Sequence, residues 1–313
     1  MTNPKQSPFE LTTFRGNDIS IGTDIFYKSK IYRYNNIEDI EWDSFLNSPN
    51  IPVRIILWEK NEVLPVDFLF IPRKSKNILV GFHGAEVRPN ADLPKFQFVG
   101  SFLNETTDSL LFFSDSTLLL SERLVLGWMA GNASSHLLKR ATSVLKEANR
   151  VCGFYKTTLV GHSGGGFTAI AMGSQISNSL AISINGQVSI GHYEPWTVRS
   201  LHENVFSDEI SIDSMLTRYA DRLDLRVILE NRVEGSRFIY YAHIEDKAYT
   251  MPSFKLLADY LNIPHISGET LAGDKLLLCN WKILGNSAHA LPGTVIPFMQ
   301  YALEEKSKID LGI

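Results

Sequence analysis

The sequence predicts a mixed α/β fold in which helices cover both faces of a mostly parallel sheet. Short, nearly unbroken apolar runs such as 77–84 and 109–115 are typical of strands that are buried on both faces. Segments with apolar residues at helical spacing alternate with these runs, as in 134–153, which opens at the possible caps Ser134 and Ser135. Alternation of strand and helix indicates βαβ units, whose strands are parallel.

The remaining elements are assigned in order along the chain. Residues 1–50 are expected to form N-terminal strands and an extension, and residues 51–313 the main domain. Short antiparallel strands are predicted within 20–77. Further strands are predicted at 156–163, 180–187, 237–246 and 275–283, and helices at 164–176, 253–261 and 293–306.

Residues 188–236 interrupt this alternation. They contain helical patterns such as "DEISIDSMLTRYADRL" but no clear core strand. An excursion of this size between two sheet strands predicts a cap or lid over the edge of the sheet.

Composition narrows the class of protein. The chain has 313 residues, 44% hydrophobic and 20% charged, with a formal net charge of −4. These values predict a globular protein without a basic face for nucleic acid or anionic lipid. Cys152 and Cys279 belong to no C-x-x-C pair, so reduced buried thiols are expected, with no disulfide framework and no metal. No signal peptide or apolar run of membrane-spanning length is visible, which predicts a cytoplasmic protein with no membrane span.

A glycine-rich turn follows the predicted strand 156–163. Gly161, Ser163 and Gly165 satisfy G-x-S-x-G, the pattern that exposes a serine on a sharp turn between a strand and a helix. A plain glycine-rich corner or a phosphate cradle remains the alternative. A Walker loop is excluded, because no Gly-Lys-Ser/Thr follows.

A serine nucleophile needs a base and an acid that orients the base. Of the three histidines well downstream, His289 lies in a Gly/Asn/Ser-rich loop, whereas His243 lies in a predicted strand and His265 in a turn. The strand before 247 ends in two carboxylates, of which Asp246 is preferred and Glu245 is the alternative.

An oxyanion needs two preorganised N–H donors. The expected donors are the backbone N–H groups of Gly164, directly after the serine, and Ala85, in the turn after strand 77–84. His83 is expected to brace that turn. Asp115, Trp128 and Met129 either form a wall of the substrate site or pack a loop against the serine.

These motifs resemble those of the α/β-hydrolase superfamily. "FHGA" (82–85), "GHSGGG" (161–166), "IED" (244–246) and "SAH" (287–289) are similar to its oxyanion loop, nucleophile turn, acid strand and histidine loop, over about residues 50–306. Residues 112–131 also resemble segments of bacterial proteins found with glycosyltransferases. These are capsular-polysaccharide biosynthesis proteins and the acyltransferase-like component of accessory secretion systems. That resemblance implies acyl-ester chemistry on a glycan. Asp115, Trp128 and His83 are the candidate substrate-binding residues.

The expected function is therefore an esterase-type serine hydrolase that uses Ser163, His289 and Asp246 on a small-molecule or glycan ester, without a cofactor. The alternatives are an O-acyltransferase of polysaccharide or glycoprotein biosynthesis, and a catalytically silent partner with the same fold.

Overall fold

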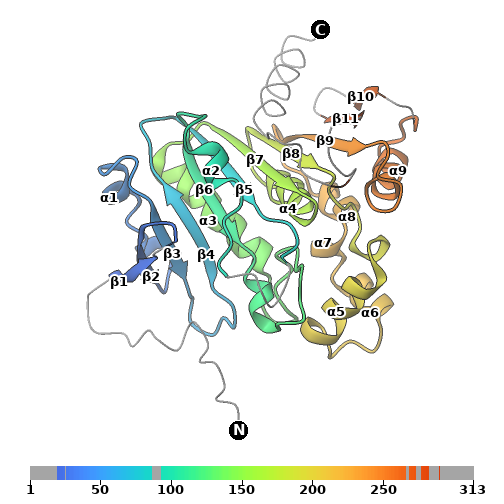
Figure 1. The fold of residues 1–313 in the computed structure, drawn as a ribbon, viewed down its shortest axis with the longest axis horizontal. Helices are drawn as coiled ribbons and strands as arrows, with labels where there is room; N and C mark the ends of the chain where they lie inside the picture. Colours follow the sequence, from blue (N-terminus) through green and yellow to red (C-terminus); the bar gives the residue numbers. More distant parts are fainter. Residues whose placement is uncertain are drawn as a thin grey trace.

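The computed structural model describes residues 20–24, 26–86, 93–265, 268–272, 276–281 and 289. Within this part the chain forms one sheet of eleven strands in the order β1-β2-β3-β4-β6-β5-β7-β8-β9-β11-β10, which Figure 1 shows. The strands are β1 (Ser20–Asp24), β2 (Ser29–Tyr34), β3 (Val53–Leu57), β4 (Val66–Ile71), β5 (Asn77–Phe82), β6 (Ser109–Ser114), β7 (Lys156–His162), β8 (Ser179–Ile184), β9 (Arg237–His243), β10 (Gly268–Ala272) and β11 (Leu276–Trp281).

Helices flank this sheet and fill the connections between strands. The α-helices are α1 (Trp42–Leu46), α2 (Val99–Phe102), α3 (Leu137–Cys152), α4 (Gly164–Gly173), α5 (Pro195–Val205), α6 (Ile212–Arg218), α7 (Ala220–Leu223), α8 (Leu225–Glu230) and α9 (Thr250–Leu261). Short 3-10 helices are η1 (Ile37–Asp39), η2 (Ser116–Leu120) and η3 (Ile190–His192).

The central part of the sheet is parallel, as predicted. β6, β5, β7, β8, β9 and β11 pair in parallel with their neighbours, while β4–β6 and β10–β11 are antiparallel. Every residue of β4, β6 and β8 is buried, which accounts for the unbroken apolar runs. The predicted mixed, mostly parallel sheet is confirmed.

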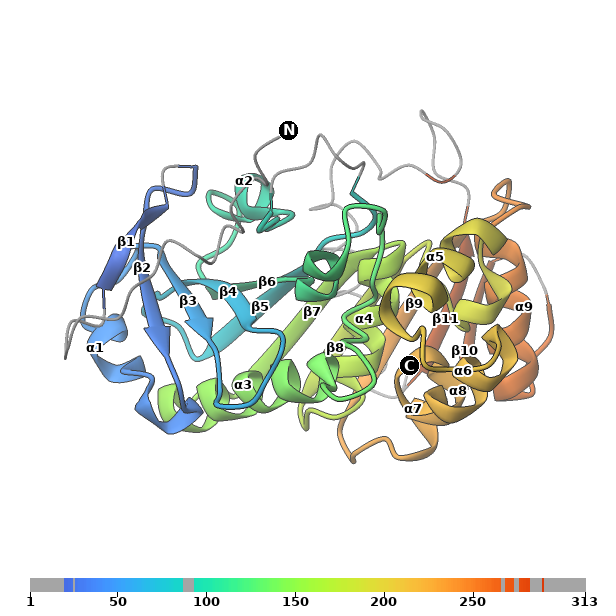
Figure 2. The same ribbon diagram turned by 90° about the horizontal axis from the view of Figure 1, so that it is seen from below.

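Two hydrophobic clusters lie on opposite faces of the sheet. Val80 and Phe82 of β5 belong to the cluster that includes α3, α4 and α9, whereas Leu79 belongs to the cluster with Phe102 of α2. Successive strand residues point to opposite faces, so this alternation separates the two clusters. Figure 2 shows α2 and α3 on opposite sides of the sheet.

The front of the sheet differs from the expectation in one pairing. β1–β2 and β3–β4 are antiparallel, but β2 and β3 are parallel. The connection between them contains η1 and α1, whose Trp42 and Phe45 are buried. A parallel pair needs such a crossover, whereas the antiparallel pairing expected at the front of the sheet does not.

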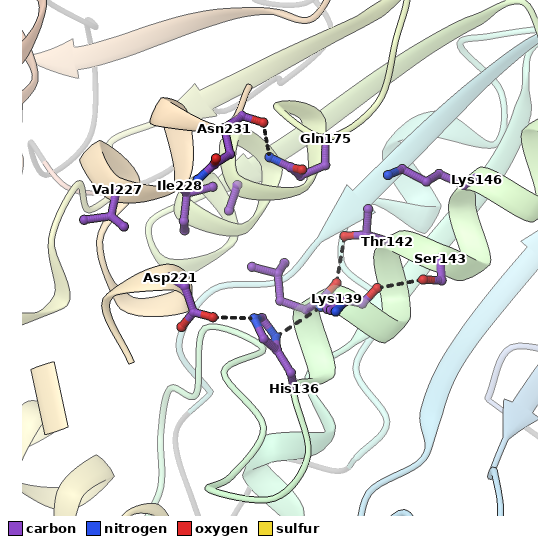
Figure 3. Close-up of a pocket in the computed structure, with 12 residues that line it drawn as sticks. His136, Lys139, Thr142, Ser143, Lys146, Gln175, Asp221, Val227, Ile228 and Asn231 are labelled. Atoms are coloured by element: carbon purple, nitrogen blue, oxygen red, sulfur yellow. Dashed lines mark hydrogen bonds and ion pairs between the residues drawn. The ribbon is translucent and has the colours of Figure 1, made fainter. Parts of the chain in front are cut away.

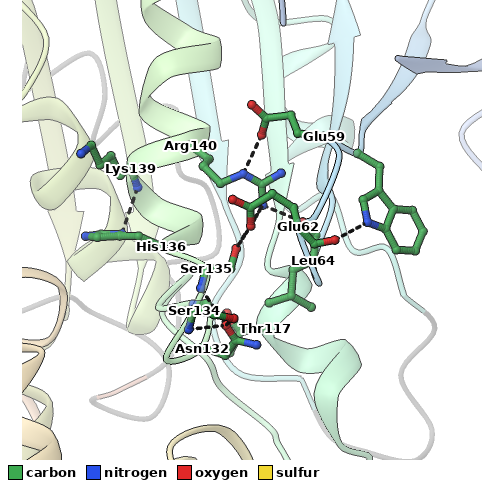
Figure 4. Close-up of polar contacts among 12 residues, drawn as sticks. Glu59, Glu62, Leu64, Thr117, Asn132, Ser134, Ser135, His136, Lys139 and Arg140 are labelled. Carbon is green, nitrogen blue, oxygen red and sulfur yellow. Dashed lines mark hydrogen bonds and ion pairs between the residues drawn. The ribbon is translucent and has the colours of Figure 1, made fainter. Parts of the chain in front are cut away.

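Helix α3 begins later than the sequence suggested. The N-cap is His136, whose side chain accepts a hydrogen bond from the Lys139 N–H at 3.3 Å, in place of Ser134 or Ser135. Ser135 is instead buried beside Arg140 and Glu62 (Figure 4). The serine therefore ties α3 to the β3–β4 connection rather than capping the helix.

Residues 188–236 contain η3, α5, α6, α7 and α8 between β8 and β9, as their helical patterns indicate. Figures 1 and 2 show these helices gathered near α4, with which α8 is in contact. Buried Arg222 links α7 to the loop before α3 by donating to the carbonyls of Ala130, Asn132 and Ser135 at 2.9, 2.9 and 3.2 Å. Whether the segment works as a cap stays a prediction.

Three further expectations concern the C-terminal helix, the two cysteines and membrane-spanning helices. The predicted helix 293–306 and the side chain of Cys279 lie outside the described residues. Cys152 is buried and unpaired, and burial raises the pKa of its thiol to about 12. Among the residues that the structure describes, no helix combines the length and apolar character needed to cross a bilayer.

Candidate active site

Ser163 occupies a sharp turn between β7 and α4. β7 ends at His162 and α4 begins at Gly164, so the serine is the only residue between strand and helix. Its φ of 53° and ψ of −122° lie outside the common regions for L-residues. A hydrogen bond from the Ser163 N–H to the Ile184 carbonyl (2.9 Å) secures this conformation. The turn is the strained geometry that the G-x-S-x-G pattern predicts.

The flanking glycines are required by close backbone contacts. A Cβ on Gly161 would lie 1.9 Å from the Gly165 carbonyl oxygen, and one on Gly165 would lie 2.6 Å from that of Phe82. Because backbone atoms cannot move aside cheaply, side chains here would separate α4 from β7 and β5. These contacts explain the glycines without a phosphate.

The structure brings His289 and Asp246 to the serine. His289 Nε2 lies 3.2 Å from Ser163 Oγ, and His289 Nδ1 lies 2.6 Å from Asp246 Oδ2. Asp246 is buried, whereas Glu245 is exposed. The aspartate is therefore the carboxylate placed against the imidazole.

Asp246 is held in its charged form. Burial alone would raise the pKa of this carboxyl, but hydrogen bonds from His289, Thr250 and the Tyr249 N–H outweigh it and lower the pKa. The Tyr249 N–H donates to Oδ1 at 3.2 Å, and the Thr250 hydroxyl donates to Oδ2. A fixed carboxylate of this kind can keep a proton on His289 Nδ1 and leave Nε2 free to accept one.

His162 holds His289 in place, a role that the sequence did not reveal. His162 Nε2 lies 2.7 Å from the His289 carbonyl oxygen, so this nitrogen must carry a proton and donate it. Burial, followed by the nearby His289, lowers the pKa of His162 to about 4. Its position next to the serine in "GHSGGG" is the available sequence signal.

The expected oxyanion donors lie at two backbone positions. Gly164 is the first residue of α4, where an N–H has no partner within its own helix. Gly84 lies against the turn, because a Cβ there would be 3.0 Å from the His162 carbonyl oxygen, and exposed Ala85 follows it. The role of both N–H groups stays a prediction.

His83, Asp115 and Trp128 are buried around the serine turn. The Asp115 N–H donates to His83 Nε2 at 2.9 Å, so the proton of this imidazole sits on Nδ1, which donates to the Gly84 carbonyl at 2.8 Å. Asp115 Oδ2 accepts from the Met129 N–H at 3.0 Å. These hydrogen bonds brace the loop around Trp128, and direct contact with substrate stays a prediction.

Gln187 and Tyr193 also reach the serine and were not anticipated. Gln187 Nε2 lies 3.2 Å from Ser163 Oγ, in the turn after β8. Burial raises the pKa of the Tyr193 phenol, and a hydrogen bond with Ser163 opposes part of this rise. No local motif marks these residues, because each reaches the site from a different loop.

Aromatic rings flank the histidine. The Tyr249 ring lies 5.2 Å from His289 between ring centroids, and Tyr193 lies 5.9 Å from Tyr249. Both tyrosines are half-buried. They offer flat apolar faces with polar tips beside the reactive groups.

A separate cavity of about 430 Å³ lies between α3, α4 and the helices of the insertion (Figure 3). His136 and Asp221 approach each other at its edge, with 3.6 Å between Nε2 and Oδ2. Its lining includes none of Ser163, Asp246 and His289. The cluster of Ser163, His289 and Asp246 therefore lies at the turn after β7 and not in the lining of this cavity.

Comparisons with known proteins bear on the fold. No protein-family model and no curated protein matches the chain. The Gap123 glycosylation-associated protein complex of Streptococcus agalactiae aligns with a TM-score of 0.53 at 13% identity, over 83% of this chain and 46% of that chain. A mutant capsule O-acetyltransferase of Neisseria meningitidis serogroup A, in complex with CoA, aligns with a TM-score of 0.50 at 15% identity, over 80% and 97%. Acetyl xylan esterase 1 of Thermoanaerobacterium sp. aligns with a TM-score of 0.46 at 14% identity, over 84% and 92%.

At such low identities the likeness establishes the fold alone. The protein has an α/β-hydrolase-like fold, with a mostly parallel sheet and Ser163 on the strand–turn–helix between β7 and α4, and it is similar in fold to the capsule O-acetyltransferase and the Gap123 complex. The predicted fold class is confirmed.

Proposed function

We propose that this protein carries out serine-dependent acyl-ester hydrolysis, with Ser163 as nucleophile, His289 as general base and Asp246 as the group that orients the base. The observation that carries the proposal is the continuous chain from Ser163 Oγ to His289 Nε2 (3.2 Å) and from His289 Nδ1 to Asp246 (2.6 Å). A glycine-rich corner with only a structural role does not require this series of hydrogen bonds.

The geometry supports a two-step reaction. Ser163 Oγ attacks the ester carbonyl carbon while its proton passes to His289 Nε2. The carbonyl oxygen takes up negative charge, for which the Gly164 and Ala85 N–H groups are the proposed donors. His289 then gives the proton to the departing alkoxide, and water releases the acyl group from the serine.

Transfer of the acyl group to a sugar hydroxyl is the second candidate. It uses the same groups, with the hydroxyl in place of water. The half-buried rings of Tyr193 and Tyr249 beside His289 favour it, because aromatic faces pack well on the apolar faces of sugar rings. The resemblance of residues 112–131 to glycan-associated proteins points the same way.

Labelling with a fluorophosphonate probe tests the nucleophile. The folded wild type should form an adduct that Ser163→Ala abolishes and His289→Ala strongly slows. His265→Ala is the matched control, because this exposed histidine bonds only to Asp259 among the described contacts and should leave labelling intact. A folded wild type without an adduct would support the catalytically silent partner instead.

A product assay then separates hydrolysis from transfer. The protein is given p-nitrophenyl acetate with and without a soluble glycan, and acetate and acetylated glycan are measured. Free acetate alone supports the esterase. Acetylated glycan that disappears in Ser163→Ala supports the transferase.

A further inference from the structure

The turn that carries Gln187 is pinned on both sides. The Asn185 side chain accepts from the His243 N–H at 2.9 Å. The Val188 carbonyl accepts from the Leu225 N–H at 2.8 Å. Gln187 itself is 2% exposed. Its side chain therefore starts from a backbone with little freedom to shift.

The side-chain amide of Gln187 has one orientation that satisfies both of its neighbours. Trp128 Nε1 lies 3.0 Å from Gln187 Oε1, and an indole N–H can only donate. The amide oxygen therefore faces Trp128, and the NH₂ group faces Ser163 Oγ at 3.2 Å. Gln187 therefore donates to the serine. If the amide flipped to accept from the serine, the hydrogen bond from the Trp128 indole would be lost.

We propose that Gln187 is a positioning residue that sets the direction of the Ser163 hydroxyl proton, an inference that rests on the proposed function of Ser163. The amide NH₂ donates to Oγ, so the hydroxyl proton cannot point at Gln187 and is available to point at His289 Nε2, 3.2 Å away. During attack this proton moves to Nε2, while an Oγ electron pair forms the bond to the carbonyl carbon. Gln187 keeps its own protons throughout.

Tyr193 does not supply the same constraint. Its phenol interacts with Ser163 in a way that opposes part of the rise in the phenol pKa, but a phenol both donates and accepts. It is therefore compatible with either direction of the serine proton. The amide held by Trp128 can only donate to Ser163, so it excludes the direction of the serine proton that points at Gln187.

The strained backbone at Trp128 supports this role. Trp128 and Met129 have φ values of 52° and 54°, a left-handed conformation that non-glycine residues rarely adopt. The hydrogen bond from the Met129 N–H to Asp115 Oδ2 (3.0 Å) holds it. Such strain persists where a side chain must be placed accurately, and here it brings the indole N–H to Gln187.

The same network reaches the loop expected to bind the oxyanion. Asp115, which holds the Trp128 loop, donates its N–H to His83, and His83 donates to the Gly84 carbonyl. The direction of the serine proton and the position of the Gly84–Ala85 turn are thus set by one set of buried contacts.

Steady-state kinetics on p-nitrophenyl acetate test the proposal with Gln187→Leu and Gln187→Glu. Leucine removes the donor, and we expect kcat to fall about 10- to 100-fold with KM changed less than about twofold. In Gln187→Glu the kcat should fall further, because the new carboxylate accepts the serine proton and turns that proton away from His289. Gln175→Glu is the matched control, since this glutamine bonds to the Asn231 carbonyl beside the separate cavity and should keep the wild-type kcat.

Trp128→Phe provides a second test that keeps an aromatic ring. It removes the indole donor and frees the amide to rotate, so kcat should fall, by less than in Gln187→Leu, with KM unchanged. Thermal unfolding verifies that each variant is folded. A wild-type kcat in folded Gln187→Leu, or a change in KM alone, would overturn the positioning role. A wild type that neither labels nor turns over ester would refute the proposed function itself, and with it this inference.

Discussion

Asp246 Oδ2 lies 2.6 Å from His289 Nδ1, although 43 residues separate the two in the chain. The aspartate lies in the turn that follows β9, and His162 next to the serine holds the carbonyl of the histidine. Their contact depends on the parallel order of β7, β8 and β9, because parallel strands bring their carboxyl ends to one edge of the sheet.

Replacing Asp246 with asparagine should lower kcat for ester turnover by about 10³- to 10⁴-fold, since an amide can stabilise the wrong tautomer of His289. Glu245→Gln is the control, because Glu245 is exposed and one residue away. Kinetics on both variants decide the assignment. Near wild-type activity in Asp246→Asn together with a large loss in Glu245→Gln would reverse it.

Substitution of Ala85 by proline tests the second oxyanion donor. Proline removes the backbone N–H, and the loss of one such donor typically lowers kcat about 10²- to 10³-fold. Ala85→Ser keeps the N–H at this exposed position and should behave like the wild type. If both variants turn over ester equally well, the donor lies elsewhere.

Gly161→Ala should destabilise the fold strongly. The new Cβ would meet the Gly165 carbonyl oxygen at 1.9 Å, and relief requires separation of β7 from α4. We expect a loss of about 2–4 kcal/mol in the free energy of unfolding, measured by urea denaturation. Gly100→Ala adds the same methyl group where nothing lies within 4 Å, and it should be nearly neutral. An equal effect of the two substitutions would contradict the steric explanation.

Stability should fall as the pH drops from about 6.5 to about 4. The pKa of His162 is lowered from 6.5 to about 4, chiefly by burial, so in this range the unfolded chain binds a proton that the folded protein does not. Stability from this group is complete above pH 6.5 and is lost toward pH 4. His136, whose pKa burial also lowers to about 4, adds to the effect.

His162→Gln isolates this contribution. In His162→Gln the drop in unfolding free energy between pH 7 and pH 5 should be smaller than in the wild type by about 1–2 kcal/mol. This range allows for the partial exposure of the His162 side chain. Urea denaturation at the two pH values measures it, and His265→Gln, at an exposed site, should follow the wild type. An unchanged pH dependence in His162→Gln would show that this imidazole titrates normally.

Much of the fold and part of the site could be predicted because local patterns encode them. Buried strands appear as apolar runs, and the turn around Ser163 needs glycines at fixed positions, so both are visible in the sequence. The parallel pairing of β2 and β3 was not, since it depends on how α1 packs between them. His162, Gln187 and Tyr193 were missed for a similar reason, because their roles depend on partners far away in the chain.

The sequence by itself determined the strand–turn–helix around Ser163, the helical character of residues 188–236 and the short set of histidines and carboxylates that could serve the serine. Steric limits on backbone and side-chain periodicity act over a few residues, so these features need no tertiary information. Only the tertiary structure placed Asp246 and not Glu245 against His289, and only it joined Trp128 to Gln187 and Gln187 to Ser163. Those contacts follow from strand order and from loops that meet at one edge of the sheet, and hydrogen bonds at about 3 Å arise only after the whole sheet has assembled.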